Sequence, residues 1–88
     1  MKLKDGMILN ELNGDFYLVD SGIQGHRFNG MIKLNQTGAF IVKALRNDTN
    51  EEQIVDSLCE TYQASVEDAR EDVHSLVLVL TENELIQS

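Results

Sequence analysis

Proline is missing from this sequence of 88 residues, and cysteine occurs only once, at Cys59. One cysteine cannot form an internal disulfide, which favours a reducing compartment. The longest uninterrupted apolar run covers residues 76–80, far fewer than the roughly 20 residues that span a bilayer. The first residues, MKLKDG, contain no apolar segment typical of a secretory signal. These absences predict a cytoplasmic protein that does not enter a membrane.

Residues that carry out chemistry are also scarce. The only histidines, His26 and His74, lie far apart in the sequence, and no metal-binding or phosphate-binding spacing occurs. Cys59 falls on the apolar face of a predicted helix, which indicates a structural thiol. Adjacent acidic pairs are typical of solvated helix faces: Glu51/Glu52, Glu67/Asp68 and Glu71/Asp72. We therefore expect no enzymatic activity, no metal and no cofactor.

Basic side chains are almost absent from the second half of the chain. Residues 1–46 contain six Lys or Arg side chains and four carboxylates, whereas residues 47–88 contain one base, Arg70, and eleven carboxylates. Many of these acids simply keep exposed helix faces hydrated. Such a surface nevertheless repels a phosphate backbone and favours a neutral or basic partner. The charge balance therefore argues against nucleic acid as a partner.

The first part of the chain has the pattern of a β-hairpin. Two apolar segments, 7–12 and 15–20, flank Asn13-Gly14. Both turn residues tolerate the positive φ of a type I′ turn, so this dipeptide is a strong hairpin signal. In the second segment Phe16 and Leu18 share one face, and the residues between them share the other.

A third strand is predicted at 31–34, after a glycine-rich stretch at 21–30 that we interpret as a long loop. Ile32 and Leu34 share one face of this strand, and the alternate residues share the opposite face. A sheet of three strands leaves two open edges, and an open edge is a template for another strand.

Three helices are predicted after the strands. Each apolar pattern repeats at helical spacing and follows a residue suited to an N-cap. The candidate caps are Asn35 or Thr37 for the first helix, Thr49 (with Glu52) or Asn50 (with Gln53) for the second, and Ser65 (with Asp68) for the third. Together the elements predict one α+β domain over residues 1–88, a three-stranded antiparallel sheet followed by three helices in a winged-helix-like arrangement.

The third helix contains more apolar residues than one face accommodates. Its predicted buried stripe is Val66, Ala69, Val73, Leu76 and Leu80. Leu78 and Val79 fall outside that stripe. Two explanations remain open: these side chains contact a partner, or they are covered by Leu85 and Ile86 folding back or by a second copy.

Gly38 poses a further question, because it lies in the expected first turn of a helix that follows a strand almost directly. Glycine in a helix costs about 1 kcal/mol relative to alanine. Either close packing of the helix on the sheet or direct contact with a partner requires a residue without a side chain here.

Residues 28–45, FNGMIKLNQTGAFIVKAL, resemble the hydrophobic-x-Leu-Asn-x-Thr-Gly-Ala-x-Ile signature of the PqqD-like family, named after pyrroloquinoline quinone synthesis protein D. Residues 49–73 are similar to the second helix and the start of the third helix in that family. The resemblance extends over about residues 28–86. Many members have a tryptophan where this chain has Val42 and a glycine where it has Glu84, and Asn83 is expected to take over the left-handed cap.

The resemblance implies a recognition element for ribosomally made, post-translationally modified peptides. In that family the leader segment of the precursor adds as a strand to the third strand and lies against the third helix. The implied partners are a precursor leader and a modifying enzyme such as a radical-SAM enzyme, a cyclase or a protease. The peptide-binding residues expected on this basis are Gly30, Met31, Ile32, Lys33 and Leu34 on the strand and Arg70, Val73, His74 and Val77 on the helix.

Two other functions are compatible with the predicted fold. The first is a structural adaptor that joins biosynthetic proteins through the apolar surface of the third helix. The second is a transcription regulator with that helix in the major groove. A DNA-reading helix needs cations near its N-terminal end, where this helix has Glu67, Asp68, Glu71 and Asp72. DNA binding is therefore the weakest of the three.

Overall fold

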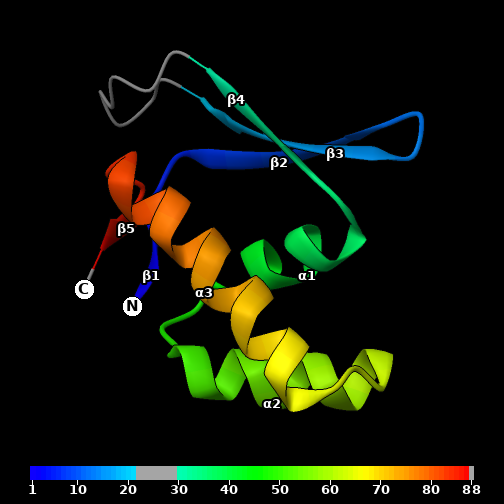
Figure 1. The fold of residues 1–88 in the computed structure, drawn as a ribbon. Coiled ribbons are helices and arrows are strands. Elements are labelled where there is room, and N and C mark those ends of the chain that lie inside the picture. Colours follow the sequence, from blue (N-terminus) through cyan, green and yellow to red (C-terminus); the bar gives the residue numbers. More distant parts are fainter. Residues whose placement is uncertain (22–29, 88) are drawn as a thin grey trace.

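The computed structural model describes residues 1–21 and 30–87 (Figure 1). The elements along the chain are β1 (Lys2–Leu3), β2 (Met7–Leu12), β3 (Asp15–Asp20), β4 (Met31–Leu34), α1 (Gln36–Ala44), α2 (Glu51–Tyr62), α3 (Val66–Glu82) and β5 (Ile86–Gln87). The predicted α+β fold class is confirmed. Most of the predicted loop, residues 22–29, lies outside the described residues.

The main sheet has the strand order β2-β3-β4, and both strand pairs are antiparallel. Asn13 and Gly14 connect β2 to β3 with φ angles of 54° and 85°, so both adopt the left-handed conformation expected for this hairpin. In the register of β3 and β4, Leu18 lies opposite Ile32. Directly opposed residues share a face, and Leu18 is completely buried, so this face meets the core.

All three helices lie on one side of the main sheet (Figure 1). Their buried residues form one core with Leu18 and Leu34 from the sheet. The opposite face of the sheet includes Ile8 and Met31, which are 42% and 63% exposed. The sheet therefore has one packed face and one open face.

The N-cap of each helix is one of the residues that the sequence suggested. The Asn35 Oδ1 accepts a hydrogen bond from the Gly38 N–H, the Asn50 Oδ1 from the Gln53 N–H, and the Ser65 Oγ from the Asp68 N–H. These side chains satisfy backbone donors that the first turn of a helix leaves without a partner. Local chemistry alone therefore determines where the helices begin.

A second, small sheet joins the two ends of the described chain. Lys2 and Leu3 in β1 pair antiparallel with Gln87 and Ile86 in β5. Leu85, which precedes β5, is 1% exposed and packs in the core. The chain after α3 therefore folds back, but it does not cover Leu78 and Val79, which are 49% and 40% exposed, so this explanation for the extra apolar residues of α3 is wrong. The sheet itself was not predicted, because strands of two residues carry no detectable alternation.

Two details of α3 differ from the sequence-based predictions. Val66 is 50% exposed, whereas Val77 is buried in the core next to Ala69, Val73 and Leu80. Val66 is the first residue of the helix, where the chain has only just left the connection from α2. The left-handed residue after α3 is Glu84, with a φ of 59°, and not Asn83, with a φ of −90°. Among the described residues, no helix combines the length and apolar content needed to cross a membrane.

Candidate functional site

Strand β4 forms an open edge of the main sheet. It pairs with β3 on one side, and no strand in the described part of the chain pairs with its other side. In a β-strand, successive residues direct their N–H and C=O groups to opposite edges, so every second residue of β4 offers both groups to the open side. This edge can accept another extended segment through main-chain hydrogen bonds.

The link between β4 and α1 is a single residue, Asn35. Its side-chain oxygen accepts the Gly38 N–H at 2.8 Å, and its carbonyl accepts the Ala39 N–H at 3.0 Å. Both bonds hold α1 at a defined angle to the end of the strand. The edge of β4 is consequently attached rigidly to the helical layer.

Gly38 allows α1 to approach β4 closely. A Cβ atom at this position would lie 3.1 Å from Leu34 Cδ2 and 3.2 Å from Leu34 Cβ. Such distances are tighter than ordinary van der Waals contact, so any larger residue would displace Leu34. Close packing therefore explains the glycine, although the same residue also lines the cleft described next.

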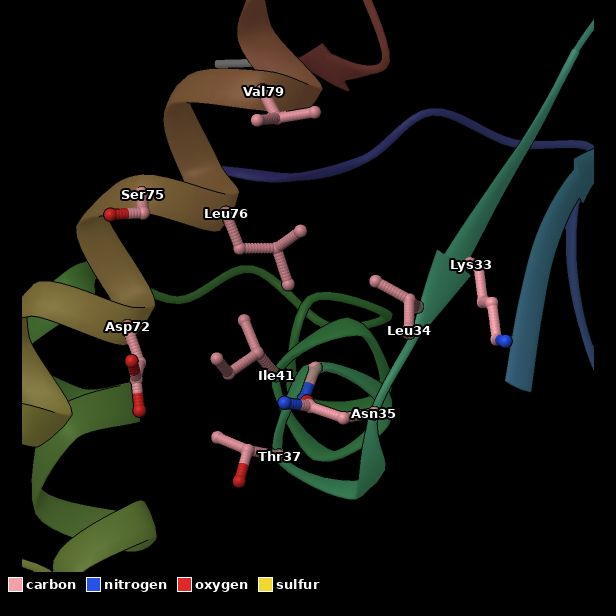
Figure 2. A pocket seen from close by; sticks show the side chains of 10 residues that line it. Lys33, Leu34, Asn35, Thr37, Ile41, Asp72, Ser75, Leu76 and Val79 are labelled. Atoms are coloured by element: carbon pink, nitrogen blue, oxygen red, sulfur yellow. The ribbon is translucent and has the colours of Figure 1, made fainter. Parts of the chain in front are cut away.

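A cleft of about 300 Å³ separates the open edge of β4 from α3 (Figure 2). Its lining combines the end of β4, the first turns of α1 and one flank of α3. The lining residues are Lys33, Leu34, Asn35, Thr37, Gly38, Ile41, Asp72, Ser75, Leu76 and Val79. We call this space the β4–α3 cleft.

The middle of the β4–α3 cleft is apolar. Figure 2 shows the side chains of Leu34, Ile41 and Leu76 directed toward one another across the space. Ile41 and Leu34 are 1% and 6% exposed, so they form a fixed floor. Val79, which is 40% exposed, lies at one end. An apolar side chain that entered here would lose contact with water without displacing any protein group.

The opposite end of the β4–α3 cleft is polar. Asp72 and Thr37 lie at this end, where α1 begins (Figure 2). Asp72 is exposed, and no Lys, Arg or His among the described residues lies within ion-pair distance of its carboxylate. Within the described residues, this end of the cleft therefore carries a negative charge with no basic side chain beside it.

The other flank of α3 faces α2, and its basic side chains contact carboxylates of α2. The Arg70 Nη2 lies 3.3 Å from the Glu52 Oε2, and the His74 Nδ1 lies 3.2 Å from the Glu51 Oε1. The second contact is an ion pair when the imidazole is protonated. Both basic side chains of α3 thus point away from the β4–α3 cleft.

The residues expected to bind peptide do not all meet at one place. Lys33 and Leu34 line the cleft, although the Lys33 side chain turns away from it to the Asp15 carboxylate, 3.8 Å distant (Figure 2). Val73 and Val77 are buried in the core. The expected residues that lie outside the lining are Gly30, Met31, Ile32, Arg70, Val73, His74 and Val77.

Of the cleft-lining residues of α3, Val79 was singled out from the sequence as a possible partner contact and Leu76 was assigned to the buried stripe, whereas Asp72 and Ser75 were missed. Asp72, Ser75, Leu76 and Val79 form one flank, at the three- and four-residue spacing of a helix. That spacing was visible in the sequence. The sequence did not show which side of α3 faces β4.

No metal site is evident in the described part of the chain, where no three His, Cys, Asp or Glu side chains are grouped so as to hold an ion. Apart from Lys33, whose ammonium turns away to Asp15, the polar side chains that line the β4–α3 cleft carry hydroxyls, an amide and a carboxylate. In chemical terms the cleft offers main-chain hydrogen bonds, an apolar surface and one negative charge.

A family model matches most of this chain. The family model for coenzyme PQQ synthesis protein D matches residues 7–86. A search of the curated proteins gives no match.

Two solved structures share the fold. The chain described as "TbiB1 in Complex with the TbiA(beta) Leader Peptide" is 20% identical, with a TM-score of 0.76, over 100% of this chain and 96% of that one. The chain described as "Lasso peptide synthetase B1 complexed with the leader peptide" is 24% identical, with a TM-score of 0.73, over 99% of this chain and 96% of that one.

Proposed function

The chain belongs to the family of coenzyme PQQ synthesis protein D, and from this premise we propose that it is a non-catalytic module that binds the leader segment of a ribosomally made precursor peptide. It captures the leader as an added strand and presents the precursor to a modifying enzyme. The observation that carries the proposal is the open edge of β4 beside the apolar β4–α3 cleft.

Main-chain hydrogen bonds supply the part of the affinity that does not depend on sequence. An extended peptide beside β4 pairs with the exposed N–H and C=O groups of that strand. Each bond contributes about 0.5–1.5 kcal/mol net, because the peptide and the edge give up hydrogen bonds to water. The rigid link through Asn35 lowers the cost of binding, since the edge is already ordered next to α3.

Apolar contacts supply the part of the affinity that depends on the sequence of the peptide. Alternate side chains of the added strand point into the β4–α3 cleft, toward Leu34, Leu76 and Val79. Burying one large aliphatic side chain contributes about 1.5–3 kcal/mol. One or two such anchors and a few main-chain bonds are sufficient for a useful affinity after the peptide has been ordered.

The solved neighbours support the same mode of action, because both are described as complexes with a leader peptide. The partners of this chain are accordingly a precursor leader and a modifying enzyme, such as a radical-SAM enzyme, a cyclase or a protease. Of the residues expected to bind peptide, Lys33 and Leu34 are supported by their place in the cleft, and Leu76 and Val79 are added to them.

Amide-resolved NMR with synthetic leader segments tests the proposal. Leader segments of precursor peptides encoded next to this protein are titrated into the full chain, with a DNA duplex as the control ligand. We expect saturable shifts in β4 and along α3 from Asp72 to Val79, with no response to the duplex. A leader that shifts neither β4 nor α3 contradicts the proposal, and a saturable response to the duplex favours a transcription regulator.

Peptides with methylated backbone amides distinguish strand addition from simple burial of side chains. One set is methylated at every odd amide and a matched set at every even amide. In an added strand only alternate N–H groups face β4, so one set loses binding and the other retains it. Equal binding by both sets contradicts strand addition.

A further inference from the structure

The two flanks of α3 differ in how their charge is compensated. Arg70 and His74 are the only basic residues of this helix, and both contact acids of α2. Asp72 lies between them in sequence but faces the β4–α3 cleft. Neither base can turn to Asp72 without giving up its contact with α2.

The negative charge at this end of the cleft is reinforced by the preceding turn. Asp68 is four residues before Asp72 and shares its side of the helix. The N-terminus of α1 lies at the same end and carries about half a positive charge. That partial charge is smaller than the full charge of the Asp72 carboxylate, so the balance at this end favours a cationic group.

The distance between Asp72 and Leu76 matches the distance between a residue of a β-strand and the second residue after it. Asp72 and Leu76 are four residues apart on α3, a rise of about 6 Å at 1.5 Å per residue. Two residues in an extended strand cover about 6.6 Å, and residues at that spacing point to the same face. One strand can therefore place side chains beside both residues with a single residue between them.

We infer that the segment bound in the β4–α3 cleft carries a Lys or Arg two positions from a large apolar residue, with the base beside Asp72 and the apolar side chain beside Leu76. This inference rests on the proposed function and specifies the peptide that the cleft selects. Asp72 is the residue that sets the preference for charge.

Selection from a random peptide library tests the inference without a known ligand. A phage-displayed library of random peptides is selected on the immobilised full chain and, in parallel, on Asp72→Lys. We expect wild-type protein to enrich basic-x-apolar peptides in one of the two orders, and Asp72→Lys to enrich acidic-x-apolar peptides instead. Glu71→Lys is the matched control, since it changes the net charge equally on a residue outside the cleft lining. It should select the same peptides as the wild type.

Fluorescence anisotropy then measures the preference on an enriched peptide and on the same peptide with its base replaced by Glu. At low salt the wild type should bind the basic form about two- to fivefold more tightly, the magnitude expected for an exposed charge pair. The ratio should fall toward one at about 1 M salt, where the screening length is about 3 Å. Asp72→Lys should reverse the preference.

The outcomes separate the inference from the function on which it rests. Enriched peptides that shift β4 amides but show no preference for charge overturn the inference and leave the proposed function standing. The same conclusion follows if Glu71→Lys changes the preference as strongly as Asp72→Lys. A selection that enriches no peptide, or only peptides that leave β4 unshifted, overturns both.

Discussion

The two flanks of α3 differ in composition and in the contacts that they make. On the flank that faces α2, Arg70 and His74 contact Glu52 and Glu51 and close the interface between the helices. On the flank that faces β4, the aliphatic side chains of the cleft lie open, and Asp72 lacks a basic neighbour within the described residues.

We infer from this difference that the proposed ligand site is defined by the contacts that the fold leaves unused. The flank with both bases of α3 resembles a binding surface when the sequence is considered alone. In the folded chain those bases are already paired. The flank with Asp72 and two partly exposed aliphatic residues has unused contacts, and it lies beside the open edge of β4.

Val79→Asp should have the largest effect on peptide binding. Val79 is 40% exposed, so the variant should fold, but a bound peptide would bury the new carboxylate in the β4–α3 cleft. An unsatisfied polar group that becomes buried costs about 1–3 kcal/mol, which corresponds to about tenfold or more in Kd. Anisotropy with a leader that binds the wild type measures the change.

Leu78→Asp is the matched control for that variant. Leu78 adjoins Val79 and is 49% exposed, but it does not line the cleft. Its Kd for the leader should stay within about twofold of wild type, as for an ordinary surface change. Equal losses in both variants would contradict the assignment of the cleft. Loss of assembly with a protein partner in Leu78→Asp alone would support an additional adaptor role.

Gly38→Ala should have the next largest effect, through the shape of the cleft. The new Cβ would displace Leu34 by a few tenths of an ångström. We expect peptide binding to weaken by about three- to tenfold, because overpacking shifts the floor on which the peptide packs. The free energy of unfolding should change by less than about 1 kcal/mol, since the gain in helix propensity offsets the crowding. Denaturant titration and anisotropy separate the two quantities, and an unchanged Kd would show that Leu34 does not position the ligand.

Arg70→Ala and His74→Ala should have small effects that are confined to stability. Both contacts are exposed, and exposed ion pairs contribute about 0.2–1 kcal/mol at most. Leader affinity should remain within about twofold of wild type. A loss of affinity as large as that of Val79→Asp would show that the α2-facing flank binds the peptide and would remove the contrast between the flanks.

Asp48→Asn should have the smallest effect, and that effect should disappear in acid. A hydrogen bond from the Met1 ammonium, 2.7 Å away, and the charge of that group hold the pKa of Asp48 below its ordinary value of 3.8. The carboxylate therefore contributes stability above that value, and the contribution is lost as the pH falls through the lowered pKa. Thermal unfolding at stepwise lower pH should show wild type converging with Asp48→Asn. Parallel curves would show that the contact does not form.

Much of the fold was predictable because its signals are local. Asn13-Gly14 determines a hairpin through its backbone preferences, and Asn35, Asn50 and Ser65 cap helices through hydrogen bonds to residues three positions away. Alternation in β3 and β4 identified which residues share a face of each strand. These interactions require only neighbouring residues, so a sequence read in short windows contains them.

The pairing of β1 with β5 could not be predicted, since it joins residues 83 and 85 positions apart through strands of two residues. The left-handed residue after α3 also depends on this return. Leu85 must reach the core, where its N–H donates to the Leu80 carbonyl at 2.9 Å, and the turn at Glu84 allows it. Hydrophobic periodicity gives no information about contacts between segments so far apart in the sequence.

By itself, the sequence determined which residues share a face of each strand and helix, because the periods of 2 and 3.6 residues follow from backbone geometry. Only the tertiary structure decided which neighbour each face meets. Residues 70 and 74 turned out to face α2, and residues 72, 76 and 79 turned out to face β4. The physical reason is that a helix can rotate about its axis without changing its own hydrogen bonds. Its orientation in the protein is set by packing of the buried residues Ala69, Val73, Val77 and Leu80 against the rest of the core.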